Sequence, residues 1–374
     1  MRPTTEQIVN ALKNVIDPDL QKNLVSLGMI ENIVTGDNTV SFKLVLTTPA
    51  CPLREKLKND CIEAVKKYVD SSLDVRVEVS SKVKTNPQVS DKTAILPQVK
   101  NIILIASGKG GVGKSTVSVN MAISLAKTGA KVGLIDADIY GPSIPMMFNL
   151  SNQKPEAFEK DGVVKVLPFE KFGIKLISIG FFVDPEKALI WRGPMASNAL
   201  KQLFTDVEWG ELDYLIIDTP PGTGDIHLTL VQTLDVAGVA IVTTPQNVAL
   251  ADARKAINMF RADGIKVPVL GLIENMSYFV PAELPENKYY IFGKDGGSKL
   301  AAEMKIPLLG QIPIVQSICE SGDAGEPIAA MENNIVEKSF VMLAEKLTQQ
   351  LSIWNAFYEA TDVEKHEETC NCKK

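Results

Sequence analysis

The sequence predicts an α/β protein, in which a mostly parallel sheet is covered by helices and is preceded by a small α+β domain. Continuous Val, Ile and Leu runs such as NIILIAS (residues 101–107) and YLIID (residues 214–218) alternate with helical patterns over most of the 374 residues. Such runs are typical of strands buried on both faces, between layers of helices. Before them lies a polar stretch with two prolines, which predicts a linker.

The small domain is expected to cover residues 1–81. Apolar residues recur at helical spacing in two segments, while apolar and polar residues alternate in two others, one of them around a Gly-Asp-Asn turn. The expected helices are residues 4–15 and 53–69, and the expected strands lie within residues 29–48, as a hairpin, and 74–81.

The linker is assigned to residues 82–98 and the large α/β domain to residues 99–351. Its expected strands follow the runs NIILIAS, KVGLIDAD, DYLIIDTPP, GVAIVTTP and PVLGLIENM, and a helical pattern, VSVNMAISLAKTG, separates the first two. After Leu351 the chain becomes polar and loses its periodicity. Residues 352–374 are therefore expected to form a mobile tail when the chain is alone.

Composition excludes several functional classes. The formal net charge of −6 provides no general basic field for a nucleic-acid backbone. No signal or transit peptide is recognisable, and no apolar run reaches the ~18 residues that span a bilayer. The five cysteines are odd in number and scattered, unlike a secreted disulfide framework. We therefore expect reduced thiols and a cytoplasmic protein without nucleic-acid or membrane partners.

The strongest motif is GKGGVGKST, at residues 108–116, which fits the pattern G-x-x-x-x-G-K-[ST] between an expected strand and an expected helix. Backbone N–H groups of such a loop surround phosphate oxygens, and the following helix N-terminus adds positive charge. Lys114 is expected to neutralise the β- and γ-phosphates of ATP, and Ser115 to bind Mg²⁺. The alternative is a glycine-rich turn without ligand. The expected nucleotide-binding residues of the loop are Gly108, Gly110, Gly111, Val112, Gly113, Lys114, Ser115 and Thr116.

Three aspartates are expected beside this loop. Asp136 and Asp138 follow one buried strand and Asp218 ends another, where ligands bind in α/β sheets. Asp218 is expected to hold Mg²⁺, Asp138 to position the attacking water and Asp136 to support the metal site. Each could instead be a helix cap or a turn residue. His227 follows the Asp218 segment and is expected to be a structural hydrogen-bonding group.

Lys109, directly after the first glycine of the loop, resembles the signature lysine of deviant-Walker P-loop ATPases. That resemblance implies a homodimer whose nucleotide sites face each other, with Lys109 reaching the partner's phosphates as a catalytic group supplied in trans. The alternative is a solvated loop lysine. Asn275 in IENM similarly resembles the adenine-reading asparagine of this superfamily.

The strings LIDADIYGPSIP, WRGPM, DYLIIDTPPGTGD and IVTTPQNVALAD, with the phosphate loop, resemble the Mrp/ApbC group of iron–sulfur cluster carrier ATPases over nearly the whole chain. The segment LTTPACPL, with Cys51, resembles a domain shared by iron–sulfur assembly factors. The resemblance implies slow, dimerisation-dependent ATP hydrolysis. It also implies transfer of an iron–sulfur cluster to apoproteins, and assembly factors as further partners.

One departure concerns the cluster ligands. Members of that group usually carry a C-x-x-C pair after the ENMS segment, and this chain has ENMSYFVPAELPENKYYIFG there. The nearby residues Pro281 and Ala282 cannot replace thiolates. Cys370 and Cys372 are an alternative pair, because two tails in a dimer would present the four thiolates of a [4Fe–4S] cluster. The tail could equally bind no metal, bind zinc or oxidise.

Cys51 is the other candidate for cluster transfer. It is expected between a strand and a helix, where the helix N-terminus favours the thiolate, although a buried or capping cysteine is the simpler interpretation. Cys61 is assigned to packing, and Cys319 is left without a role.

Two other functions compete with the cluster carrier. A spatial regulator such as a division-site or partition ATPase would need a basic amphipathic helix or surface, and this tail is acidic. A nucleotide-dependent scaffold that holds no cluster would be distinguished by iron and sulfide analysis.

Overall fold

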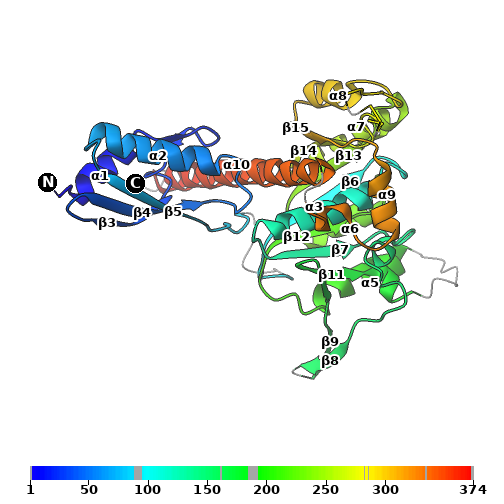
Figure 1. Cartoon of the computed structure of the whole chain (residues 1–374). Helices are drawn as coiled ribbons and strands as arrows, with labels where there is room; N and C mark the ends of the chain where they lie inside the picture. The colour runs from blue at the N-terminus through cyan, green and yellow to red at the C-terminus, as the bar shows by residue number, and fades with distance from the viewer. Residues whose placement is uncertain are drawn as a thin grey trace. The chain divides into compact units, whose positions relative to one another are not determined.

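The structure is a computed structural model that describes residues 2–87, 95–160, 162–183, 193–281, 283–284, 286–332 and 335–371. The chain divides into two compact units (Figure 1). The smaller unit contains Met1–Lys84 and Thr348–Lys374, and the larger unit contains Thr85–Leu347. None of the described helices has the length and hydropathy needed to span a bilayer.

In residues 1–84 of the smaller unit, two helices accompany a three-stranded sheet with the order β3-β4-β5. Strands β3 and β4 form the expected antiparallel hairpin, and β5 pairs with β4 in parallel. A capping box between Thr4 and Gln7 starts the first helix. The elements are α1 (Thr5–Leu12), β1 (Ile16–Asp17), β2 (Lys22–Asn23), β3 (Ile30–Thr35), β4 (Thr39–Leu46), α2 (Arg54–Tyr68) and β5 (Asp74–Ser81).

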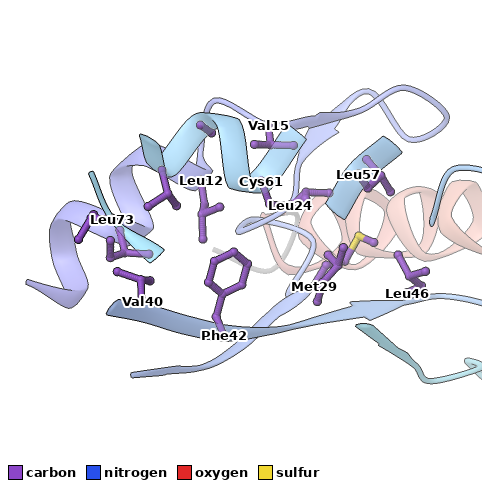
Figure 2. Packing of buried hydrophobic residues seen from close by; sticks show 14 residues of the cluster. Leu12, Val15, Leu24, Met29, Val40, Phe42, Leu46, Leu57, Cys61 and Leu73 are labelled. Carbon is purple, nitrogen blue, oxygen red and sulfur yellow. The ribbon is translucent and has the colours of Figure 1, made fainter. Parts of the chain in front are cut away.

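The core of this unit lies between the helices and one face of the sheet. Figure 2 shows Phe42 of β4 pointing toward Leu12 and toward Cys61 of α2, all at most 3% exposed. On β4, burial alternates along the strand, so that every second residue faces the core. Burial raises the pKa of Cys61 to about 12, which keeps its thiol protonated. The assignment of Cys61 to packing is therefore confirmed.

The larger unit is built on an eight-stranded sheet with the order β10-β11-β7-β12-β6-β13-β14-β15. All neighbouring pairs are parallel except β10 and β11. The predicted mostly parallel sheet is confirmed. Its strands are β6 (Val99–Ser107), β7 (Val132–Asp136), β10 (Phe169–Lys171), β11 (Ile174–Ser178), β12 (Leu212–Asp218), β13 (Val236–Thr243), β14 (Val269–Glu274) and β15 (Leu308–Gln311).

Helices follow most strands of this sheet and pack against it. The helix after the phosphate loop contacts β6, β7 and β12, and the helix after β13 contacts β13 and β14. A separate hairpin joins β8 (Ala157–Lys160) to β9 (Val163–Val166). The helices are α3 (Lys114–Lys127), α4 (Ile144–Met147), α5 (Gly193–Thr205), α6 (Asp225–Thr233), α7 (Asn247–Arg261), α8 (Gly296–Met304), α9 (Gln316–Asp323) and α10 (Ile335–Asn371), with short 3₁₀ turns at Ile179–Phe181 and Ile328–Ala330.

The prediction of an aperiodic tail after Leu351 was wrong for most of its length, because α10 continues to Asn371. Within the smaller unit, Leu351 and Asn355 are buried, and Gln349 Nε2 donates a 2.7 Å hydrogen bond to Asp19 Oδ2. Residues at this spacing lie on one face of a helix, so their burial gives the polar-looking segment a packed side.

Candidate nucleotide site

The predicted site residues meet at the carboxyl edge of three adjacent strands. Strand β12 lies between β6 and β7, and Asp218 at its end is in register with Ile105 on one side and Asp136 on the other. The phosphate loop leaves β6 two residues further on. Sheet pairing therefore brings together residues that are about a hundred positions apart in sequence.

The loop conformation depends on glycine. Gly111 and Gly113 have φ angles of +78° and +80°, in the left-handed region that L side chains rarely adopt. A Cβ atom on Gly113 would also collide with Nδ2 of Asn275, whereas one on Gly111 would meet nothing within 4 Å. Gly113 is followed directly by α3, whose first residue is Lys114.

Lys114 is buried among carboxylates. Its side chain is 6% exposed, and Nζ lies 2.9 Å from Asp218 Oδ2 and 3.6 Å from Asp138 Oδ2. This ammonium group therefore lies at the loop centre, where a phosphate chain would be neutralised.

Two serines orient the Asp218 carboxylate. Ser115 Oγ donates to Asp218 Oδ2 at 2.6 Å, and Ser118 Oγ donates to Asp218 Oδ1 at 2.6 Å. Oxygen ligands of this kind, a hydroxyl and a carboxylate beside phosphate, are those that Mg²⁺ uses in nucleotide sites. The donors at Ser115 and Asp218 therefore fit a magnesium ion.

Asp136 and Asp138 differ in their surroundings. Asp136 is fully buried and accepts a 2.8 Å hydrogen bond from Ser178 Oγ. Burial, with the charge of Asp218 as a further cause, raises the pKa of Asp136 to about 7. Burial also raises the pKa of Asp138, against the opposing effect of Lys114. Asp138 Oδ1 is buried without a hydrogen-bond partner in the described structure, so it can accept one from a ligand or water.

A cleft of about 780 Å³ opens in front of these residues. Its walls are formed by the phosphate loop with Lys109, the Asp138 segment, and apolar residues of α9 and of the connection between β15 and α9. Asn275 lines the cleft, and its Nδ2 donates a 2.8 Å hydrogen bond to the carbonyl of Val112. Its role in adenine recognition remains a prediction, and the structure adds a role in holding the loop. Cys319 also lines this cleft.

Sequence reasoning missed Ser118 and Ser178. Ser118 lies four residues after Lys114 on the same helix, so its position facing Asp218 follows helical spacing. Ser178 ends β11, beside β7, and only the strand order places it against Asp136. The apolar cleft wall from Met146, Ile291 and Pro313 likewise depends on tertiary packing.

The candidate cluster thiols have different locations. Cys51 lies between β4 and α2 in the smaller unit, where it packs against the hydrophobic core and lines a small cavity. Cys372 lies outside the described residues, as does the side chain of Cys370. Among the described residues, Cys51, Cys61 and Cys319 are not in disulfide bonds. In the part of the chain that is described, no three His, Cys, Asp or Glu side chains are grouped to hold a metal ion.

The parallel sheet, the glycine loop after β6 and the buried Lys114–Asp218 pair define a P-loop NTPase. Residues 98–348 match the family model described as a NUBPL iron-transfer P-loop NTPase, and residues 5–79 match that of an iron–sulfur cluster assembly protein. The chain therefore belongs to the NUBPL iron-transfer P-loop NTPase family.

Similar proteins cover both units. An iron–sulfur cluster carrier protein from Synechocystis is 46% identical, over 94% of this chain and 98% of the relative. One from Deinococcus radiodurans is 44% identical, over 93% and 96%. Among solved structures, a nucleotide-binding protein from Archaeoglobus fulgidus in complex with ADP is 37% identical with a TM-score of 0.55, over 66% of this chain and 93% of that one.

Proposed function

We propose that this protein is an ATP-hydrolysing iron–sulfur cluster carrier, which binds a cluster and transfers it to apoproteins. The observation that carries the proposal is the convergence of Lys114, Ser115 and Asp218 at one edge of the sheet, in a family member that also has an iron–sulfur assembly domain. The cluster is cargo, and ATP is the substrate of the cleft.

The nucleotide reaction is assigned to residues at the sheet edge. Lys114 neutralises the β- and γ-phosphates, and backbone N–H groups of residues 108–116 surround the phosphate chain. Ser115 and Asp218 would hold Mg²⁺, which supplies positive charge to the phosphates. Asp138 accepts a hydrogen bond from the attacking water through Oδ1, the atom that has no partner in the described structure.

Lys109 is assigned to the partner's active site in a homodimer. It lines the cleft, and its side chain forms no ion pair with other described residues, although its carbonyl accepts a 3.0 Å hydrogen bond from Ser107 Oγ. Its backbone is therefore fixed while its ammonium group is available. This makes hydrolysis slow in the monomer and dependent on dimerisation.

The cluster is proposed to be [4Fe–4S], held by Cys370 and Cys372 of two chains. Cys51 is the second candidate, for cluster transfer. The domain limits proposed from the sequence are 1–81, 82–98, 99–351 and 352–374. Apoprotein acceptors and assembly factors are the proposed partners, in the cytoplasm. The alternative is a nucleotide-dependent scaffold or spatial regulator ATPase that holds no cluster.

Turnover at increasing protein concentration tests the dimer. The rate per chain should rise with concentration in the wild type, and Lys109→Ala should reduce the plateau about 10³-fold, as loss of a trans-acting cation does in related phosphoryl transfers. Lys114→Ala provides the matched loss of the cis lysine. A rate per chain that does not change with concentration, together with full activity of Lys109→Ala, would contradict the dimeric mechanism.

Transfer is tested with the reconstituted protein and an apo-enzyme whose activity requires a [4Fe–4S] cluster. Recovery of enzyme activity in the presence of a chelator that traps free iron is the expected result. Recovery that disappears when the chelator is present would mean that iron is released rather than transferred, and would reject the carrier role.

A further inference from the structure

His227 is a buried imidazole next to the nucleotide site that the reaction above does not use. It lies on α6 and is 1% exposed. Its ring contacts Phe260 edge-on, with centroids 5.9 Å apart. Nδ1 is buried and has no hydrogen-bond partner in the described structure. Burying a polar ring with one nitrogen unpaired costs folding free energy. We therefore expect the one hydrogen bond that the ring keeps to contribute to the structure.

That remaining bond reaches the residue after Asp218. His227 Nε2 lies 3.2 Å from Thr219 Oγ1, and Thr219 Oγ1 donates to the carbonyl of Ile105 on β6 at 3.0 Å. A hydroxyl has a single proton, so Thr219 offers His227 a lone pair. With the Thr219 proton directed to Ile105, the tautomer that carries its proton on Nε2 would complete the hydrogen bond to Thr219.

The loop from Thr219 to Gly224 connects this bond to the site. Gly222 N donates to the carbonyl of Ser107, at the start of the phosphate loop, at 2.8 Å. Pro221 lines the nucleotide cleft. Burial lowers the pKa of His227 to about 4, while the carbonyls of Gly224 and Pro220 oppose this effect. Both carbonyls belong to the same loop, which therefore lies near the ring.

We propose that His227 is a positioning residue for nucleotide hydrolysis. Its imidazole, through Thr219, fixes the loop Thr219–Gly224 against β6, so that the loop remains beside the γ-phosphate position and Asp218 keeps its orientation. The bond joins His227 to Thr219 and includes no residue of the phosphate loop, so we expect His227 to affect the catalytic step more than nucleotide binding. The inference rests on the hydrolysis part of the proposed function.

The test compares His227→Leu, His227→Gln and Thr219→Val. Leu removes the donor, Gln keeps an N–H donor near the position of Nε2, and Val replaces the partner hydroxyl with a methyl group while preserving shape. We expect kcat for ATP to fall about tenfold in His227→Leu and in Thr219→Val, with KM changed less than about threefold. His227→Gln should retain kcat within about threefold. The double variant His227→Leu/Thr219→Val should be no worse than either single variant.

Two results would overturn the proposal. One is unchanged kcat in Thr219→Val, and the other is equal impairment of His227→Gln and His227→Leu, which would indicate ring packing alone. A wild-type rate no higher than that of Lys114→Ala would instead reject the proposed hydrolysis.

Hydrogen exchange would then still decide the positioning role. Amides of residues 219–224 should exchange about tenfold faster in Thr219→Val than in wild type, and equal exchange would overturn the role. The sequence has two histidines, so ¹⁵N-histidine spectra are simple to assign. A proton on Nε2 at neutral pH is expected, and one on Nδ1 alone would contradict the derived hydrogen bond.

Discussion

Gly113→Ala tests how the phosphate loop is held in its binding conformation. The new Cβ has two separate costs. An L residue at φ +80° costs roughly 1–2 kcal/mol, and the Cβ displaces the Asn275 amide, which then loses its hydrogen bond to the Val112 carbonyl. Leaving that buried pair unsatisfied costs about 1–3 kcal/mol. Together, the two costs disfavour the nucleotide-binding conformation of the loop by about 2–5 kcal/mol.

The assay is titration with a fluorescent ADP analogue, in the wild-type and Asn275→Ala backgrounds. In Asn275→Ala the collision is gone, so Gly113→Ala should have only the backbone cost. The double-mutant cycle should therefore show a coupling of about 1–3 kcal/mol, or about 5- to 150-fold in Kd. Gly111→Ala is the matched control, because its φ is +78° and its Cβ meets no atom within 4 Å. It should have the same effect in both backgrounds.

An equal effect of Gly113→Ala in both backgrounds would contradict the contact between this position and Asn275. The loop would then be strained by φ alone, and Asn275 would have no role in holding it. A coupling of the same size for Gly111→Ala would also contradict the assignment, because it would place the effect of Asn275 on the whole loop rather than on one contact.

Three further predictions concern acid–base behaviour, access to Cys51 and the Asp218 carboxylate. Because the pKa of Asp136 is raised to about 7, the nucleotide-free wild type should lose about 2–3 kcal/mol of stability between pH 5 and 7 relative to Asp136→Asn. Denaturant titration measures this difference. The same pH dependence in both proteins would exclude the raised pKa. The cavity beside Cys51 is about 20 Å³ and is partly lined by Ile353 of α10. Ile353→Ala should therefore accelerate alkylation of Cys51 about three- to tenfold, as measured by mass spectrometry. An unchanged rate would show that α10 does not cover the thiol. Ser118→Ala should reduce ATP turnover about fivefold, since Asp218 Oδ1 loses its 2.6 Å donor, whereas full activity would show that Ser115 alone orients the carboxylate.

Much of the fold could be predicted from local pattern. The strands NIILIAS and YLIID are apolar on both faces, so their type and their place in a parallel sheet follow from the sequence alone. The antiparallel edge strand β10 and the full length of α10 could not be predicted. In α10 the buried residues include Thr348 and Asn355, and polar residues at core positions conceal the helical period from a hydropathy pattern.

The site residues that belong to a sequence motif could be predicted. Lys114 and Ser115 have positions that the loop pattern fixes, and Asp218 ends an apolar strand, so their meeting follows from the carboxyl-edge rule. Ser178 was not predicted, and for His227 the sequence indicated a structural hydrogen-bonding group without a partner. Their partners are Asp136 and Thr219, and each contact depends on strand order or on a loop that folds back, which no local spacing encodes.

Anaerobic cluster reconstitution would show whether this protein holds an iron–sulfur cluster. Iron and acid-labile sulfide would be measured per dimer for the wild type, for Cys370→Ser/Cys372→Ser, and for Cys51→Ser as the matched single-site comparison. We expect about four irons and four sulfides per wild-type dimer, lost in the double variant and retained in Cys51→Ser. No cluster in the wild type would contradict the carrier function and leave an ATP-dependent scaffold, and equal loading of the double variant would contradict the assignment of the ligands.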